Sequence, residues 1–129
     1  MPRKTLPPLS PLQLAIMQLV WEHSEVTVGE IVELMSVTRP IARTTVQTTM
    51  VRLEEKGWLK HRQVANAFRY SAAVEREASM RNMLSNLVDK AFGGSVEGLL
   101  MTLLQERPPA ADEVDRIRKL IEQSVNKGR

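Results

Sequence analysis

The chain has 129 residues, of which 43% are hydrophobic and 26% are charged, a composition typical of a soluble globular protein. It contains no cysteine, which excludes disulfides, thiolate metal sites and thiol catalysis. No apolar run approaches the roughly 18 residues that a membrane-spanning helix needs, and no apolar signal segment follows Arg3 and Lys4, so we expect a cytoplasmic protein without membrane insertion.

Side chains suited to catalysis or metal binding are scarce. His23 and His61 are the only histidines, and the sequence shows no carboxylate or second histidine at metal-ligand spacing beside either one. It also shows no nucleophile–base pair and no phosphate-binding loop. The sequence therefore predicts a protein that binds no metal or cofactor and is not an enzyme.

Positive charge is concentrated in one part of the chain. The net charge is +3, but residues 39–69 hold seven Lys and Arg against Glu54 and Glu55, so this segment alone carries seven minus two, or +5. Such a concentration is typical of a surface that binds a polyanion. The alternative is an ordinary solvated charged face.

Two short helices are predicted near the N-terminus. Ser10 and Pro11 have the residue types of an N-cap and a first helical position, and apolar spacing continues to about His23. Thr27 stands three residues before Glu30, which is the spacing of a capping box at the start of a second helix.

A third helix and a hairpin complete the first part of the chain. The segment "ARTTVQTTMVRLEEKG", residues 42–57, reads as a helix ended by Gly57, although its four threonines disfavour helix interiors. The runs "WLKHRQV" and "FRYSA" read as two strands joined at "ANA", with Asn66 at the tip. This order predicts a winged helix-turn-helix; the alternative is a generic small α+β domain.

Three amphipathic helices are predicted after the hairpin, separated by Gly93-Gly94 and Pro108-Pro109. The fold class is thus mainly α with a small β-ribbon, divided into a DNA-binding domain (1–74) and a helical dimerisation region (75–129). A helical region this short is marginal as an independent core. We therefore expect it to pair with a second copy of the chain; the alternative is that it packs on the winged domain. The predicted dimer contacts are Leu84, Leu87, Val88, Leu99, Leu100, Leu103, Ile117 and Ile121.

The third helix is the predicted recognition helix. On a helical wheel Ala42, Val46, Thr49, Met50 and Leu53 gather on the core side, and we expect the Thr49 hydroxyl to bond to a carbonyl one turn earlier. The residues predicted to contact bases are Arg43, Thr44, Gln47 and Thr48. The residues predicted to contact phosphates are Thr45, Arg52, Lys56, Lys60, Arg62 and Arg69. For Arg3 and Lys4 a disordered tail is favoured over the alternative of a further arm on the DNA backbone.

The segments "LSPLQLAIMQLVWE", "TTVQTTMVRLEEKGWL", "AFRYSAAVERE" and "AFGGSVEGLL" resemble the penicillinase-repressor (BlaI/MecI) type of bacterial regulator, in the same order along nearly the whole chain. The resemblance implies a winged-helix homodimer that binds double-stranded DNA at a palindromic operator and represses transcription. It carries DNA contact to the region of Thr44, Thr45, Gln47, Thr48 and Arg52. Copper-responsive relatives have cysteine pairs near the C-terminus, which this chain lacks.

The resemblance also implies a way of relieving repression. In well-known members a membrane sensor protease system triggers cleavage in the helix after the Gly-Gly, commonly at an Asn-Phe bond. The corresponding place here is Thr102-Leu103, a poor match. The alternatives are a winged-helix regulator that responds to a small ligand held by its methionines, and a protein-interaction adaptor that binds no nucleic acid.

Overall fold

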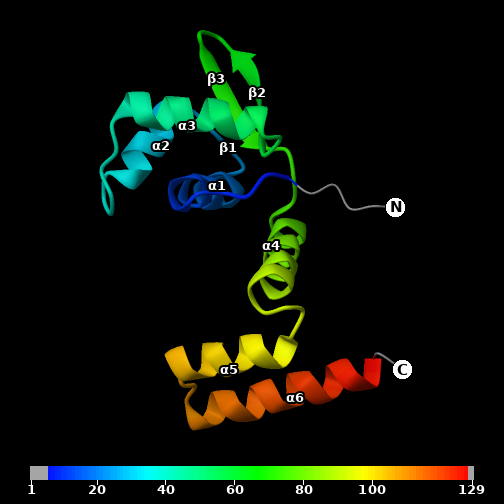
Figure 1. The fold of residues 1–129 in the computed structure, drawn as a ribbon. Coiled ribbons are helices and arrows are strands. Elements are labelled where there is room, and N and C mark those ends of the chain that lie inside the picture. Colours follow the sequence, from blue (N-terminus) through cyan, green and yellow to red (C-terminus); the bar gives the residue numbers. More distant parts are fainter. Residues whose placement is uncertain (1–5, 128–129) are drawn as a thin grey trace. The chain divides into compact units, whose positions relative to one another are not determined.

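The computed structural model describes residues 6–127 and divides the chain into two units, residues 1–84 and 85–129. Three helices and a small sheet make up most of the N-terminal unit (Figure 1). Its elements are α1 (Pro11–His23), β1 (Glu25–Val26), α2 (Val28–Met35), α3 (Arg43–Glu55), β2 (Leu59–Val64), β3 (Ala67–Ala72) and the first part of α4 (Arg76–Ala91). This is the winged helix-turn-helix order that the sequence predicts.

Capping boxes begin α1 and α2; the sequence predicts the box at Thr27, and for α1 it predicts only the N-cap role of Ser10. The backbone N–H of Gln13 donates to Ser10 Oγ at 3.2 Å, and Ser10 N–H donates back to Gln13 Oε1 at 2.9 Å. Thr27 and Glu30 make the same reciprocal pair at 3.1 and 3.0 Å. Each box satisfies backbone donors that have no partner within the helix, so the two helix starts are fixed locally.

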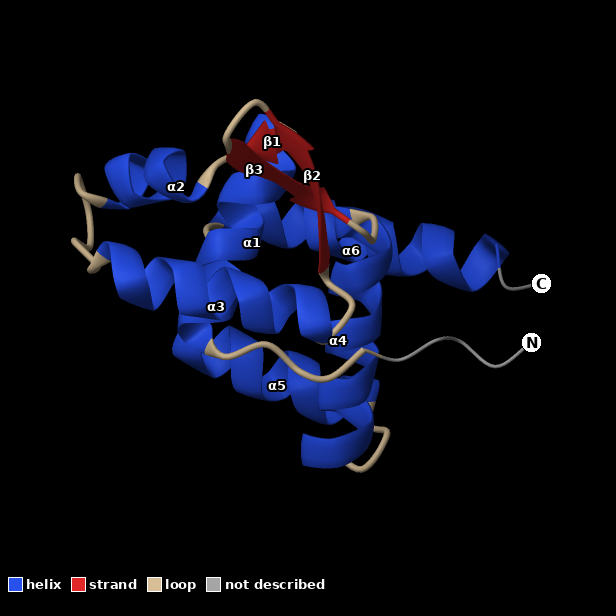
Figure 2. Ribbon diagram, turned by 90° about the horizontal axis from the view of Figure 1, so that it is seen from above, coloured by secondary structure: helices blue, strands red, loops and turns tan. Residues whose placement is uncertain are grey.

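The strands form a three-stranded antiparallel sheet in the order β1-β3-β2, coloured red in Figure 2. β1 is an addition to the predicted hairpin: its two residues pair with β3, with Glu25 opposite Ser71. Arg62 of β2 lies directly opposite Arg69 of β3. The hairpin turns at Ala65 and Asn66, and Ala65 has the left-handed φ of 56°.

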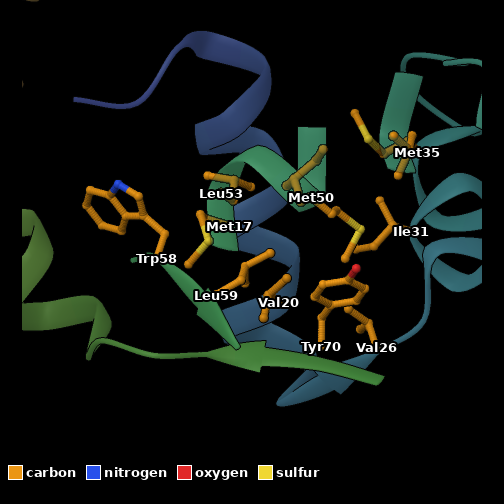
Figure 3. Packing of buried hydrophobic residues seen from close by; sticks show 12 residues of the cluster. Met17, Val20, Val26, Ile31, Met35, Met50, Leu53, Trp58, Leu59 and Tyr70 are labelled. Carbon is orange, nitrogen blue, oxygen red and sulfur yellow. The ribbon is translucent and has the colours of Figure 1, made fainter. Parts of the chain in front are cut away.

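One hydrophobic core holds the N-terminal unit together. Its side chains come from all three helices and the sheet, as Figure 3 shows for Met17, Met50 and Tyr70. Met17, Met35 and Met50 are buried, as expected for methionines that fill a core. Ala42, predicted on the core side, is instead exposed, because it is the N-cap of α3 and precedes the first buried residue, Val46.

Two tryptophans bind the segments that precede α1 and follow β3. Trp21 Nε1 donates to the carbonyl of Val74 at 3.0 Å, and Trp58 Nε1 donates to the carbonyl of Pro7 at 2.9 Å. Arg76 in the first turn of α4 reaches Gln18 of α1 at 3.5 Å. The Arg76 bond joins the first turn of α4 to α1 within the N-terminal unit, while the domain boundary after residue 74 stays a prediction.

The C-terminal unit consists of the rest of α4, α5 (Val96–Glu106) and α6 (Ala111–Lys127). Gly93 and Gly94, with φ of 58° and 84°, turn the chain after α4, and Ser95 caps α5 by accepting a bond from Gly98 N–H at 2.9 Å. None of residues 85–126 is buried. No helix within residues 6–127 is long and apolar enough to span a membrane.

The turn after α3 gives a first prediction. Gly57 has φ 94°, and a Cβ there would lie 3.1 Å from Leu6 Cδ2. Because side-chain-bearing residues disfavour left-handed backbone, Gly57→Ala should lower the free energy of unfolding by about 1–2 kcal/mol in urea denaturation. Ala65→Gly is the opposite control and should leave stability unchanged or raise it by up to about 1 kcal/mol; a loss like that of Gly57→Ala would contradict the argument.

Candidate nucleic-acid interface

The exposed face of α3 is fixed by what the opposite face buries. Val46, Met50 and Leu53 are each 0% exposed in the core. Arg43, Thr44, Gln47 and Thr48, the predicted base-contact residues, are all exposed, as are the predicted phosphate contacts Thr45 and Arg52. The structure thus presents an exposed face of mostly polar residues from Arg43 to Thr48, without an acidic side chain in the first turn.

The hydroxyls of α3 differ in part from the sequence interpretation. Thr49 Oγ1 donates to the carbonyl of Thr45 at 2.7 Å, which confirms the predicted back-bond. Thr48 Oγ1, from a residue predicted to contact a base, makes the same bond to the carbonyl of Thr44 at 2.9 Å. Since the Thr48 proton is committed to the backbone, this side chain offers acceptor lone pairs and a methyl group outward.

A hollow of about 240 Å³ joins the start of α3 to the wing. Arg43 and Gln47 line it from α3, and Asn66 and Phe68 line it from the hairpin; the other lining residues are Thr27, Val28, Ala67 and Tyr70. Arg43 also lies against α2, where a Cβ built on Gly29 would be 3.2 Å from Arg43 Nη1. The fold therefore brings Arg43, Gln47 and Asn66 together, although they come from two separate elements.

The predicted phosphate-binding cations fall into two groups. Arg52 and Lys60, like Arg43, are exposed and make no ion pair with any residue that the structure describes. Lys56, Arg62 and Arg69 are held by other parts of the chain. Arg3 and Lys4, the alternative arm, lie outside the described residues.

Lys56 acts as an internal anchor in this structure. Its Nζ donates to Gln13 Oε1 at 3.0 Å and to the carbonyl of Pro8 at 3.2 Å. Gln13 is itself buried and belongs to the first capping box. Lys56 therefore ties the end of α3 to the start of α1, a role that its position in the helix wheel did not indicate.

Glu25 of β1 binds both wing arginines. Its carboxylate accepts bonds from Arg62 Nε at 2.7 Å, Arg62 Nη2 at 2.9 Å and Arg69 Nε at 3.1 Å. Arg69 Nη2 also lies 3.4 Å from Glu30 Oε1. The hydrogen bonds from Arg62, with those of Arg69 and both positive charges, lower the pKa of Glu25 to about 2. The same carboxylate raises the pKa of Arg62.

His61 connects the other face of the wing to α3. Its Nδ1 lies 2.6 Å from Glu54 Oε1, a carboxylate partner that the sequence pattern did not indicate. Its ring also packs on Phe68, at a centroid distance of 4.4 Å, and on Tyr70, at 5.4 Å. Burial, with a contribution from the charge of Glu54, raises the pKa of Tyr70. Among the described residues, no three His, Asp or Glu side chains could hold a metal ion together.

A protein-family model described as penicillinase repressor matches residues 9–123. The chain belongs to the penicillinase repressor family. It is 22% identical over 124 residues to the penicillinase repressor of Bacillus licheniformis, an alignment that covers 96% of this chain and 97% of that relative. The family and this relative are repressors rather than enzymes. The resemblance to this family and the prediction that the chain is not an enzyme are therefore confirmed.

Solved structures support the same fold for this penicillinase repressor family member. The monomeric form of Bacillus licheniformis BlaI, solved in complex with the blaP half-operator, is 29% identical with a TM-score of 0.51; the match covers 58% of this chain and 92% of that one. Wild-type MarR from E. coli, at 17% identity, has a TM-score of 0.53 over 90% of this chain and 77% of its own. The predicted winged-helix fold class is therefore confirmed.

The low pKa of Glu25 predicts how acid changes the stability of this family member. Its carboxylate has a pKa of about 2 in the folded state and an ordinary value of 4.5. Its stabilising contribution is therefore full above pH 4.5 and is lost as the pH falls toward 2. Glu25→Gln should be less stable than the wild type at pH 7, and this difference should shrink by pH 3 in urea denaturation. A difference that is constant or grows on acidification would contradict the assignment.

Proposed function

We propose that the chain is a sequence-specific transcriptional repressor that inserts α3 into the major groove of operator DNA. The carrying observation is the exposed face of α3, whose Arg43 and Gln47 share one hollow with the wing-tip Asn66. Membership of a repressor family supports the proposal, as does the half-operator complex of BlaI. Action on a bacterial operator places the chain in the cytoplasm.

The side chains of this face suit the edges of base pairs. Arginine pairs bidentately with guanine and glutamine with adenine, so Arg43 and Gln47 are the proposed readers of these bases. Thr44 and Thr48 have short side chains, which allow the helix backbone to approach the bases closely. Thr48 also turns a methyl group and oxygen lone pairs outward. Glu54 and Glu55 occur only in the last turn of α3, where Glu54 is held by His61.

Phosphate contacts come first from the cations without internal partners. Arg52 and Lys60 are exposed and unpaired among the described residues, and Thr45 adds an exposed hydroxyl on α3. Lys56 can join them only by leaving Gln13, and Arg62 and Arg69 only by leaving Glu25. We therefore propose Arg52 and Lys60 as the principal contacts that hold the protein on the DNA backbone.

Substitutions on α3 and on the wing should have different effects on binding. Gln47→Ala should weaken operator binding by about 1–3 kcal/mol and relax preference at one base position in each half-site, because a base contact is lost. Lys60→Ala should weaken operator and random duplexes alike and reduce the salt slope by about one. Gel shifts at several salt concentrations measure both. No sequence preference by the wild-type chain at any salt would refute the proposed function.

We further propose that the repressor is a homodimer formed through the C-terminal helices. Of the predicted dimer contacts, Leu84, Leu87, Leu103 and Ile121 are about half exposed, and none of the others is buried. Such apolar faces are marginal without a partner, and a two-fold pair of this unit would cover them. A two-fold dimer matches a palindromic operator.

Charge substitutions at the proposed interface should dissociate the dimer. Leu103→Glu and Ile121→Glu place an ionised group on the apolar face, so analytical ultracentrifugation should report the mass of a single chain. Operator affinity should fall by about 100-fold or more as avidity is lost. Gln123→Glu adds the same charge at an exposed polar position of α6 and should leave the dimer intact. A monomeric wild-type chain would contradict the proposal.

Two further sequence hypotheses receive no additional support. Cleavage at Thr102-Leu103 stays a prediction, since this bond lies inside α5, where Thr102 Oγ1 donates to the carbonyl of Gly98 at 3.0 Å. A protease, and with it a membrane sensor system, would act only after α5 unwinds. For a small ligand, the buried positions of Met17, Met35 and Met50 favour core packing over an adaptable pocket.

A further inference from the structure

The wing contains two arginines that face each other and share one carboxylate. Arg62 and Arg69 are paired residues of β2 and β3, and Glu25 of β1 accepts hydrogen bonds from both. Like charges directly opposite in a sheet destabilise it unless an opposite charge lies between them. Glu25 therefore allows a wing with two adjacent arginines to form before any DNA is present.

The two arginines are not equivalent. The Arg69 side chain is 32% exposed and lies between two carboxylates, those of Glu25 and Glu30. The Arg62 side chain is 65% exposed and has Glu25 as its sole carboxylate partner among the described residues. Arg69 therefore links the wing to β1 and α2 through its two ion pairs. Arg62, in contrast, can leave Glu25 without disturbing the core.

The bond between Glu25 and Arg62 has the geometry of phosphate recognition. Two nitrogens of one guanidinium, Nε and Nη2, donate to the two oxygens of the carboxylate at 2.7 and 2.9 Å. The same two-point pairing is the one that arginine makes with a phosphate group. An oxygen pair of the DNA backbone and the Glu25 carboxylate would thus compete for the same donors.

We propose that Glu25 is a specificity-determining residue that competes internally with DNA phosphate for Arg62 and so lowers binding to non-operator DNA. The inference rests on the proposed function. Phosphate contacts supply essentially all of the affinity for random DNA but only a share of the affinity for an operator, which base contacts also hold. Withholding one wing arginine therefore weakens random binding more than operator binding.

The salt dependence of binding measures this competition directly. Each phosphate contact contributes about 0.9 to the slope of log affinity against log salt. Glu25→Gln keeps the shape of the side chain but removes its charge, so it should release Arg62 and steepen the slope on a random duplex by about one. At 50 mM salt one additional contact strengthens random binding by about tenfold, and the ratio of operator to random affinity should fall.

The experiment uses the full-length chain and fluorescence anisotropy with a random-sequence duplex and an operator duplex. Arg62→Ala is measured in the wild-type and Glu25→Gln backgrounds as a double-mutant cycle. Arg62→Ala should hardly change the salt slope in the wild-type background, but it should reduce the slope by about one in the Glu25→Gln background. Glu22→Gln is the charge-matched control: Glu22 is exposed on α1 without an ion pair among the described residues, so its slope should stay at the wild-type value.

Distinct outcomes separate the two proposals. If wild-type protein prefers its operator but Glu25→Gln leaves the slope unchanged, or Arg62→Ala reduces it equally in both backgrounds, competition by Glu25 is refuted while the repressor function stands. If the wild type binds no DNA, both proposals fail. If circular dichroism shows that Glu25→Gln is unfolded, the single variant Arg62→Ala decides. A salt slope that falls by a full unit in this variant means that Arg62 of the wild type already contacts a phosphate, and this result refutes the inference.

Discussion

The surface proposed to face DNA depends on the burial of one stripe of α3. Val46, Met50 and Leu53 are completely buried, each worth about 1.5–3 kcal/mol in removed apolar area. The four threonines disfavour the helix by at most about 0.7 kcal/mol each. Burial outweighs propensity, so packing holds a helix that its composition alone would leave marginal. The same stripe fixes which residues remain outside, and Arg43, Thr44, Gln47 and Thr48 follow from it.

A second constraint comes from electrostatics within the wing. A surface for a polyanion needs cations close together, but two arginines opposite each other in a sheet repel before the polyanion arrives. β1, a strand of only two residues, places Glu25 beside both arginines, where its carboxylate accepts hydrogen bonds from them. Counting charges along residues 39–69 therefore overstates the cations that are free, because the acid that holds two of them lies outside the segment.

The sequence predicted those features that depend on neighbours in the chain. The N-cap at Ser10, the capping box at Thr27, the stop at Gly57 and the hairpin turn at Asn66 are local signals, and each appears in the structure where expected. β1 was missed because two residues cannot show a periodic pattern.

Features that depend on distant residues were harder to predict from the sequence. The partners of Lys56 and Arg62 are 43 and 37 residues away, and only the fold brings them together. Glu54 and His61 are seven residues apart, but they meet only because the chain reverses at Gly57. The exposure of one polar side of α3 was therefore predictable, whereas the internal partners of the surrounding cations were not.

The threonines of α3 show how a bond to the backbone changes which groups a proposed DNA-contact residue can offer to a base. With its proton given to the Thr44 carbonyl, the Thr48 hydroxyl acts outward as an acceptor, beside its own methyl group. An acceptor suits the exocyclic amine of cytosine or adenine, and a methyl suits that of thymine. Thr49 makes the same bond from a half-buried position, where no base can approach. Two adjacent threonines with identical local bonding thus have different proposed roles, because the helical rotation between them leaves Thr48 exposed and Thr49 half-buried.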